Sequence, residues 1–405
     1  MASKTRYNSN KAMGFGCASI FFLIIALLTQ FYAPAFRGTW GGTFSYFGCV
    51  LLTFYFIASA VSARYNLGNV GNKETRSKIE RYNKLYTEKS KEGTAEERKA
   101  VAAEMTNDYY DLATDFYQYG WGNMFHFAPR FKGEPFHESL RRHEYWLAHR
   151  GGMTKGQKWL DLGCGVGGPM RNIARFSEAH VTGINVCQYQ IEKTTALNRA
   201  EGLDHLTACV NCDFMKLTEK LTPGGYDGAY AIEATCHASD RVKCFSEVFK
   251  CLKPGGVFVV YDWVMTDKYD AKNPEHVRVK RGIEAGDSLP DLVRQEDVVA
   301  AFKKAGFQVE EHFDRCKESQ QNVRENPVPW YSTIAPGWSP ENWKSSVVGR
   351  TITHCMVTVL EAVGLAPQGT VATHTMLCGA LEPLSTGGIT GIFTPAYYVK
   401  GRKPL

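Results

Sequence analysis

The amino-acid sequence predicts a doubly wound α/β fold built on a mostly parallel sheet. Residues 158–264 alternate short strand-like runs with segments of helical periodicity. Several of the strand-like runs are apolar throughout, which is typical of parallel strands covered by helices on both faces. A glycine-rich stretch joins the first strand to the first helix, as in nucleotide-binding α/β proteins.

The elements of this core follow one another at short intervals. Strands are expected at 158–163, 180–186, 206–210, 226–232 and 256–261. Helices are expected after the glycine stretch as far as Phe176, and then at 189–202 and 240–252. A Lys-Pro-Gly-Gly turn at 253–256 is expected to end the last helix. The segments 261–267 and 273–276 follow the fifth strand and are predicted to be functional loops, with plain connecting loops as the alternative.

The charge of the chain argues against a nucleic-acid-binding domain. The net charge is +6 over 405 residues, but residues 1–65 contribute five basic side chains and no acidic one. The remaining chain carries 42 basic and 41 acidic side chains, so it is nearly neutral. A nucleic-acid binder concentrates positive charge on its folded domain. The excess here surrounds an apolar N-terminus, which indicates a membrane as the partner.

Residues 1–65 are predicted to form a membrane anchor. Uncharged runs of 25 and 26 residues separate Lys11, Arg37 and Arg64, and about 20 apolar residues span a bilayer. Basic residues flank both outer ends, so the favoured topology is a two-helix hairpin with both ends in the cytosol. One pass plus an interfacial segment, or a signal peptide, are the alternatives. Residues 66–104 are polar and are expected to form a linker with helical character.

The twelve cysteines do not form a disulfide framework. Most of them lie within apolar runs, which is typical of buried, reduced thiols in a cytosolic domain. The single CxxC motif, Cys209–Cys212, lacks a second pair at zinc-binding spacing. No metal site is therefore expected.

The glycine motif predicts the nucleotide-binding site. Asp161 precedes Gly163, Gly165 and Gly167 at the junction of the first strand and helix. A dinucleotide site and a ligand-free glycine turn are the competing interpretations. Asp161 is placed to receive the amino group of a methionine moiety. This argues against both a dinucleotide site and a ligand-free turn.

Two further positions distinguish the possible cofactors. The second strand ends in Asn185, where a dinucleotide site has an acidic residue that binds the ribose. The third strand ends in Asp213-Phe214, suited to an adenine amino group and the face of its ring. Together with the glycine motif, these residues resemble the class I methyltransferases, with their Rossmann-like sheet, whose cofactor is S-adenosyl-L-methionine.

Two segments upstream of the core are candidates for chemistry. Residues 109–127 combine many aromatic side chains with acidic ones, and aromatic faces stabilise cations. Residues 139–147 are expected to be helical, with His143 and Glu144 beside an apolar stripe. An aromatic core stripe and a structural histidine are the plain alternatives.

Two residues follow the fourth strand, where ligands bind in open α/β sheets. Glu233 and His237 are therefore predicted at the junction of cofactor and substrate.

Four blocks of the sequence closely resemble the sterol C-24 methyltransferases. They are Tyr-Gln-Tyr-Gly-Trp with Phe-His-Phe, Leu-Asp-Leu-Gly-Cys-Gly-Val-Gly-Gly-Pro, Ile-Glu-Ala-Thr-Cys-His-Ala, and Tyr-Asp-Trp-Val-Met-Thr-Asp with Asn-Pro-Glu-His. The resemblance covers about residues 105–403. It implies a methyltransferase domain at 105–330 and a C-terminal α+β sterol methyltransferase region at 331–405.

The resemblance also implies a reaction. The Δ24 double bond of a sterol side chain takes the methyl group, a cation forms at C25, a hydride shifts from C24, and a base removes a proton. The aromatic and acidic residues implied to stabilise the cation are Tyr119, Trp121, Glu233 and Asp262. The implied base is the His143–Glu144 pair, with His126 as the alternative. A methyltransferase acting on another membrane lipid or a prenylated quinone is the alternative function.

Two positions depart from the family pattern. Gln118 stands between the two tyrosines where glutamate is usual, and Asp262 replaces a usual glutamate. The expected location is the endoplasmic reticulum membrane, with the catalytic domain facing the cytosol. The sequence leaves open whether the protein forms a homo-oligomer and which sterol it prefers.

Overall fold

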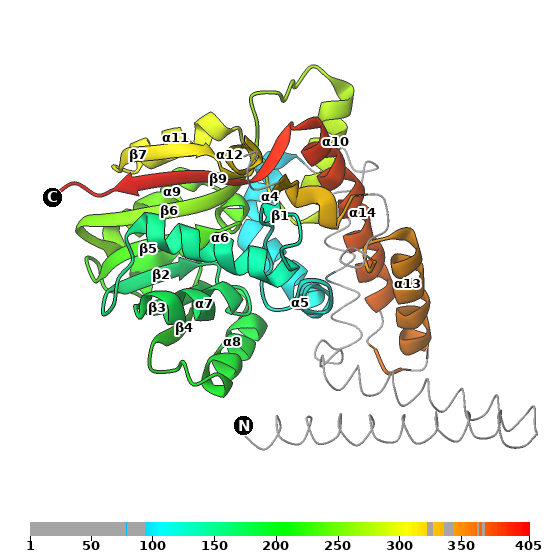
Figure 1. Ribbon diagram of the computed structural model, residues 1–405, viewed down its shortest axis with the longest axis horizontal. Helices are drawn as coiled ribbons and strands as arrows, with labels where there is room; N and C mark the ends of the chain where they lie inside the picture. Colours follow the sequence, from blue (N-terminus) through cyan, green and yellow to red (C-terminus); the bar gives the residue numbers. More distant parts are fainter. Residues whose placement is uncertain (1–77, 79–93, 322–326, 336–342, 363, 367–368) are drawn as a thin grey trace, which may run out of the picture. The chain divides into compact units, whose positions relative to one another are not determined.

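One seven-stranded sheet forms the centre of the larger part of the described chain, in the order β4-β3-β2-β5-β6-β9-β7 (Figure 1). The structure is a computed structural model that describes residues 78, 94–321, 327–335, 343–362, 364–366 and 369–405. Its strands are β2 (Lys158–Leu162), β3 (His180–Asn185), β4 (Thr207–Asn211), β5 (Tyr226–Ile232), β6 (Leu252–Met265), β7 (Gln308–Asp314) and β9 (Phe393–Arg402). A separate two-stranded sheet pairs β1 (Arg130–Phe131) with β8 (Pro327–Val328).

The described residues also form α-helices. They are α4 (Ala95–Ala100), α5 (Ala102–Trp121), α6 (Phe136–Gly151), α7 (Gly168–Ser177), α8 (Gln188–Ala200), α9 (Arg241–Cys251), α10 (Pro274–Gly286), α11 (Gln295–Lys304), α12 (Arg315–Gln321), α13 (Val347–Ala362) and α14 (Thr370–Thr390). Short 3-10 helices are η2 (Phe214–Glu219), η3 (Thr235–His237) and η5 (Trp330–Thr333).

The first five strands of the sheet are parallel, and this confirms the predicted doubly wound core. The sheet as a whole is mixed, because β9 runs antiparallel to both β6 and β7. In Figure 1, β9 lies between these two strands and carries the C-terminus. A strand from the segment assigned by sequence to a C-terminal region is therefore part of the central sheet.

Alternating burial on both faces of the strands produces two hydrophobic cores. Val257 and Val259 of β6 pack on one face with residues of α6 and α7. Phe258 and Val260 face the opposite side and pack with residues of α9 and α11. This is the pattern expected for strands that helices cover on both faces.

The region around β6 differs from the sequence prediction in two ways. The Lys253–Gly256 turn does not precede β6 but lies within it. At this point the pairing of β6 with β5 shifts register between Tyr226 and Gly228, and Gly255 adopts φ +75°. The strand also continues to Met265 instead of ending in a loop at Tyr261. The cause is β9, since Val264 pairs with Thr394 and thereby extends the ladder.

The second predicted loop also contains regular structure. Asn273 is the N-cap of α10, and its side-chain oxygen accepts a hydrogen bond from the backbone N–H of Glu275. Pro274 occupies the first turn, where its missing N–H costs nothing. The 273–276 segment therefore starts a helix.

The predicted anchor at 1–65 lies outside the described residues. Among the helices of the described residues, none is long and apolar enough to cross a bilayer. The C-terminal end of the predicted linker is described and helical: Thr94 forms a capping box with Glu97 at the start of α4.

The chain divides into two units, one comprising residues 80–350 and 375–405 and the other residues 1–79 and 351–374. The first contains the central sheet. In the second, the Glu361 carboxylate accepts hydrogen bonds from the backbone N–H groups of Gly369 and Val371. These two hydrogen bonds connect the C-terminal part of α13 to the start of α14.

The contact between α10 and α14 depends on a missing side chain. A Cβ atom on Gly286 would lie 2.3 Å from the Cβ of Ala380 and 2.7 Å from its Cα. We expect Gly286→Ala to lower the free energy of unfolding by about 1–3 kcal/mol, the usual cost of overpacking. The measurement is the denaturation midpoint of the full chain.

Gly379 of α14 provides the matched control, since a Cβ atom there meets no atom within 4 Å. Gly379→Ala should stabilise the chain, by up to about 1 kcal/mol, because alanine is the better helix former. Equal midpoints for the two variants would contradict the proposed close contact.

Candidate active site

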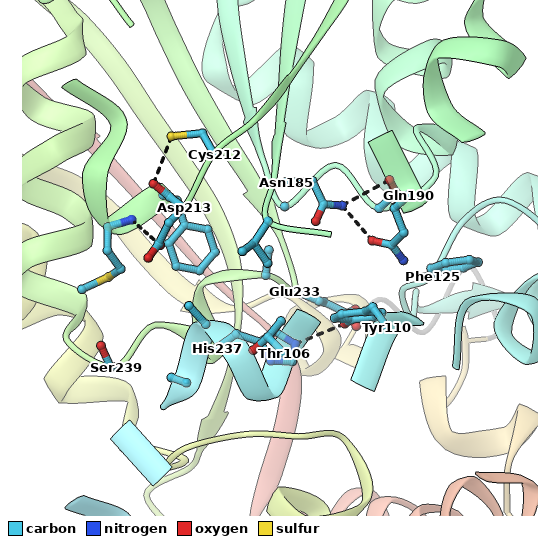
Figure 2. Close-up of a pocket in the computed structure, with 18 of the residues that line it drawn as sticks. Thr106, Tyr110, Phe125, Asn185, Gln190, Cys212, Asp213, Glu233, His237 and Ser239 are labelled. Carbon is cyan, nitrogen blue, oxygen red and sulfur yellow. Dashed lines mark hydrogen bonds between the residues drawn. The ribbon is translucent and has the colours of Figure 1, made fainter. Parts of the chain in front are cut away.

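A pocket of about 100 Å³ lies at the carboxyl ends of β2, β3, β4 and β5 (Figure 2). This is the edge at which open α/β sheets bind ligands. Helix α5 contributes four residues to the wall, so it covers the strand ends. The lining comprises Ala102, Ala103, Thr106, Tyr110, Phe125, Gly163, Gly165, Asn185, Val186, Gln190, Cys212, Asp213, Phe214, Met215, Ile232, Glu233, Ala234, His237 and Ser239.

Two of the three predicted glycines line this pocket. Gly163 and Gly165 have φ angles of +75° and +53°, a region that favours glycine. A Cβ atom on Gly163 would lie 2.4 Å from the Cβ of Ala234, so the turn requires glycine. Gly167 does not line the pocket. Its missing Cβ instead leaves room for Thr194 of α8, whose Cγ2 would lie 2.4 Å away.

Asp161 supplies a buried carboxyl group beside the glycine turn. It is 3% exposed, and its Oδ2 has no hydrogen-bond partner among the described residues. Burial raises the pKa of this carboxyl to about 7. An unpartnered buried acceptor is costly unless a donor reaches it. Asp161 does not itself line the pocket, but it lies two residues before Gly163, which does. An ammonium group that reached it would satisfy this carboxyl.

The residues at the ends of β3 and β4 have distinct roles. The side-chain amide of Asn185 donates to Gln190 Oε1 (2.7 Å) and accepts from the backbone N–H of Cys187 (2.9 Å), so it braces the loop. Asp213 Oδ1 accepts from the Met215 N–H (2.8 Å) and caps η2. Phe214 adds an aromatic face to the wall. This pair fits an adenine ring and its amino group.

Glu233 forms the wall at the end of β5. Its backbone has φ +53°, which is uncommon outside glycine and carries strain. Oε1 accepts from the backbone N–H of Phe127 (2.8 Å), and Oε2 accepts from the indole N–H of Trp263 (2.7 Å). Burial raises the pKa of the carboxyl to about 8. These two hydrogen bonds, the Glu233 clamp, connect the 126–127 segment to β5 and β6.

His126 and Glu144 form a buried pair outside the pocket lining. His126 Nε2 lies 2.9 Å from Glu144 Oε1, and Nδ1 lies 2.9 Å from the carbonyl of Phe127. Both partners are acceptors, so both ring nitrogens carry protons. Burial opposes this charge, but the hydrogen bond and charge of Glu144 outweigh it and raise the pKa of His126. Asn172 occupies the other oxygen of Glu144.

His143 and Glu144, predicted together as the base, do not bond each other in the structure. His143 is completely buried and stacks on Tyr261, with ring centroids 3.9 Å apart. Neither ring nitrogen has a hydrogen-bond partner among the described residues, and burial lowers its pKa well below the ordinary value. Successive residues of a helix point in different directions, which separates the two side chains.

Three residues assigned to cation stabilisation lie away from the pocket lining. Asp262 is fully buried and pairs with Arg241 (Nε–Oδ2 2.9 Å), so its charge is already compensated. The ring of Tyr119 faces Lys344 Nζ at 4.4 Å. Trp121 packs against other aromatic rings. Of the four predicted residues, only Glu233 reaches the pocket.

Phe214 was predicted and lines the pocket, but two other aromatic residues of the lining were not singled out by the sequence analysis. They are Tyr110 of α5 and Phe125. Helical spacing would have found the first, because Ala103, Thr106 and Tyr110 are three and four residues apart and share one face of α5. His237, predicted at the cofactor–substrate junction, also lines the pocket.

Two protein families match parts of this chain. Residues 160–260 match a family described as methyltransferase domain, and residues 341–405 match one described as sterol methyltransferase C-terminal. The chain is similar in fold to the cyclase SpnF (TM-score 0.55, 20% identity, 75% of this chain and 97% of that one). It is also similar to geranyl diphosphate C-methyltransferase from Streptomyces coelicolor, solved with S-adenosyl-L-homocysteine (TM-score 0.52, 14% identity, 75% and 97% covered).

Two curated relatives cover most of both chains. Cycloartenol-C-24-methyltransferase of Arabidopsis thaliana is 45% identical over 338 residues, which are 83% of this chain and 97% of that protein. Sterol 24-C-methyltransferase erg6 of Aspergillus fumigatus is 42% identical over 338 residues, or 80% and 88%. Identity at this level across nearly the whole length establishes that the chain belongs to the sterol C-24-methyltransferase family.

Proposed function

We propose that the chain transfers a methyl group from S-adenosyl-L-methionine to C24 of a Δ24-unsaturated sterol side chain, as a step in sterol biosynthesis. Family membership and the pocket at the strand ends support this reaction. The similarity to sterol methyltransferases includes the C-terminal 341–405 segment, which favours a sterol over another membrane lipid or a quinone.

The cofactor site follows from the fit of the pocket residues and of Asp161, which lies beside the glycine turn outside the pocket lining. S-adenosyl-L-methionine supplies a methyl group activated by a positively charged sulfonium. Asp161 would hold the ammonium group of the methionine moiety, and the Gly163–Gly165 turn would bring the backbone close to it. Asp213 and Phe214 would hold the adenine. Because ammonium and sulfonium are cationic, their presence favours the ionised form of the buried carboxyls.

The observation that carries the proposal is the position of Glu233. The alkene of a sterol has no ionisable group, and a carboxyl buried next to it would serve no purpose in binding the neutral substrate. Once the alkene has taken the methyl group, the side chain carries a positive charge, and Glu233 stands at the pocket wall with its orientation fixed by two N–H donors. The faces of Tyr110 and Phe125 add cation–π stabilisation.

The purified chain should transfer label from S-adenosyl-L-methionine to Δ24 sterols and not to their side-chain-saturated counterparts. Glu233→Gln should reduce kcat at least 100-fold, roughly the effect of removing one preorganised electrostatic group. Cofactor affinity should change much less. The measurement is steady-state methylation combined with equilibrium binding of S-adenosyl-L-homocysteine.

The control is Glu247→Gln, which removes another buried carboxylate that bonds Thr218 and does not line the pocket. It should leave kcat within about threefold. Label on saturated sterols, or full activity in Glu233→Gln, would refute the proposed role of the carboxyl.

We also propose that residues 1–65 hold the protein at the endoplasmic reticulum membrane, with the catalytic domain in the cytosol. Only the sequence supports this: two long uncharged runs with basic flanks, and a cofactor made in the cytosol. In sealed microsomes, added protease should destroy a C-terminal tag without detergent. A protected tag would reverse the topology, and a tag released by carbonate washing would exclude integral anchoring.

A further inference from the structure

Tyr110 and His237 form a hydrogen-bonded pair in the pocket wall (Figure 2). The Tyr110 hydroxyl lies 3.2 Å from His237 Nε2, and His237 Nδ1 lies 3.2 Å from the carbonyl oxygen of Ser288. A carbonyl only accepts, so Nδ1 carries the proton of the neutral imidazole. Nε2 is then the acceptor, and the Tyr110 hydroxyl donates to it. The Ser288 carbonyl therefore determines the direction of the hydrogen bond between Tyr110 and His237.

The surrounding backbone holds this pair in one orientation. Ser288 has φ +57°, and its hydroxyl donates to the carbonyl of Met105 at the start of α5. His237 belongs to η3, directly after the Glu233 clamp, and its ring meets Tyr110 edge-on at 5.6 Å. Strained positions such as Glu233 and Ser288 persist where the surroundings fix them, and they cluster at functional sites.

Three titratable groups considered as proton acceptors, His126, Glu144 and Glu233, are poorly suited to take a proton from the sterol. His126 already carries two protons, and Glu144 uses both oxygens on His126 and Asn172. Neither lines the pocket. Both oxygens of Glu233 accept N–H donors, and its charge is needed opposite the cation. Among the described residues that line the pocket, the His237 ring offers a neutral nitrogen whose partner is a hydroxyl of the pocket wall.

We propose that Tyr110 and His237 relay the proton that the sterol side chain loses after methyl transfer, an inference that rests on the proposed function. A C–H bond next to the cationic carbon breaks, and its electron pair forms the new C=C bond. The proton passes to the Tyr110 oxygen while the Tyr110 proton moves to His237 Nε2. A carbocation and a neutral imidazole become an alkene and an imidazolium, so charge and atoms balance.

The environment of His237 suits a transient acceptor. Burial lowers its pKa to about 4, with the Arg241 charge acting in the same direction and the Ser288 carbonyl opposing them. The ring is therefore neutral before each turnover and ready to accept. The imidazolium formed would be a strong acid, so it would release the proton and reset the relay. A carbocation is acidic enough to protonate even this weak base.

The test uses the full-length protein with Tyr110→Phe, which keeps the ring and removes only the hydroxyl, and with His237→Gln. Each should lower kcat about 100-fold, the usual contribution of a positioned proton acceptor. The double variant should be no slower than the slower single variant, because the two groups act as one unit. Affinity for S-adenosyl-L-homocysteine should stay within about threefold.

A kinetic isotope effect separates a proton relay from a structural role. Substrates deuterated in the side chain next to the cation, and cofactor with a trideuteromethyl group, together label every carbon that can lose the proton. The variants should show a larger primary isotope effect on alkene formation than the wild type. Tyr145→Phe, which removes a hydroxyl from a half-buried tyrosine of α6 outside the pocket lining, should behave as wild type.

The outcomes distinguish the relay from the proposed function. A wild-type protein that methylates no Δ24 sterol would refute the function itself. An active wild type together with an unimpaired Tyr110→Phe would refute the relay alone. Slow variants with an unchanged isotope effect and weakened S-adenosyl-L-homocysteine binding would show that the pair only shapes the pocket, which also overturns the relay.

Discussion

Two buried carboxyl groups that form no ion pair with the described residues are the constraint on which the site depends; the nearby His126 charge lowers the pKa of both but does not offset burial. Asp161 and Glu233 lie at the ends of neighbouring parallel strands, and burial raises the pKa of each toward or above neutrality. Asp262 shows the contrast, since Arg241 neutralises it within the fold. A carboxyl kept in a low dielectric favours any cation that enters. A cofactor with two positive groups, and a substrate that becomes positive, meet this condition.

The Glu233 carboxyl, which faces the pocket, also holds the segments of the pocket wall together. Glu233 binds the backbone of Phe127 and the indole of Trp263, so the segment after α5, the end of β5 and the extended end of β6 share one anchor. Next to Phe127, His126 forms an ion pair with Glu144 of α6, which holds the same segment in place. A buried charge pair is costly to break from one side, which makes it suitable for fixing a loop in place. The chemistry and the local fold are therefore coupled through one side chain.

The sequence predicted the parallel core well because each strand and helix there is encoded locally. Apolar runs, a glycine turn and a proline–glycine stop lie within the elements they define. It failed at Met265, because the ladder that extends β6 comes from β9, about 130 residues further along the chain. No local pattern contains that partner.

The site residues divide in the same way. Gly163, Asp213 and Glu233 follow strand ends, so topology alone brings them together. The pairing of Glu144 with His126 instead of His143 depends on how α6 is rotated against the sheet. The choice of Tyr110 over Tyr119 depends on the face that α5 presents, which a count of aromatic residues does not reveal.

The most direct test of the central claim is the proton balance of ligand binding. At pH 6, below pKa values of about 7 and 8, Asp161 and Glu233 are protonated in the free protein. Titration calorimetry in buffers of different ionisation enthalpy should show net proton release on binding S-adenosyl-L-methionine, on the order of one proton or more. S-adenosyl-L-homocysteine, which keeps the ammonium but lacks the sulfonium charge, should release fewer, and Asp161→Asn should reduce both. Binding at pH 6 without proton release would contradict the account, because it would mean that the buried carboxyls are already ionised or do not sense the ligand.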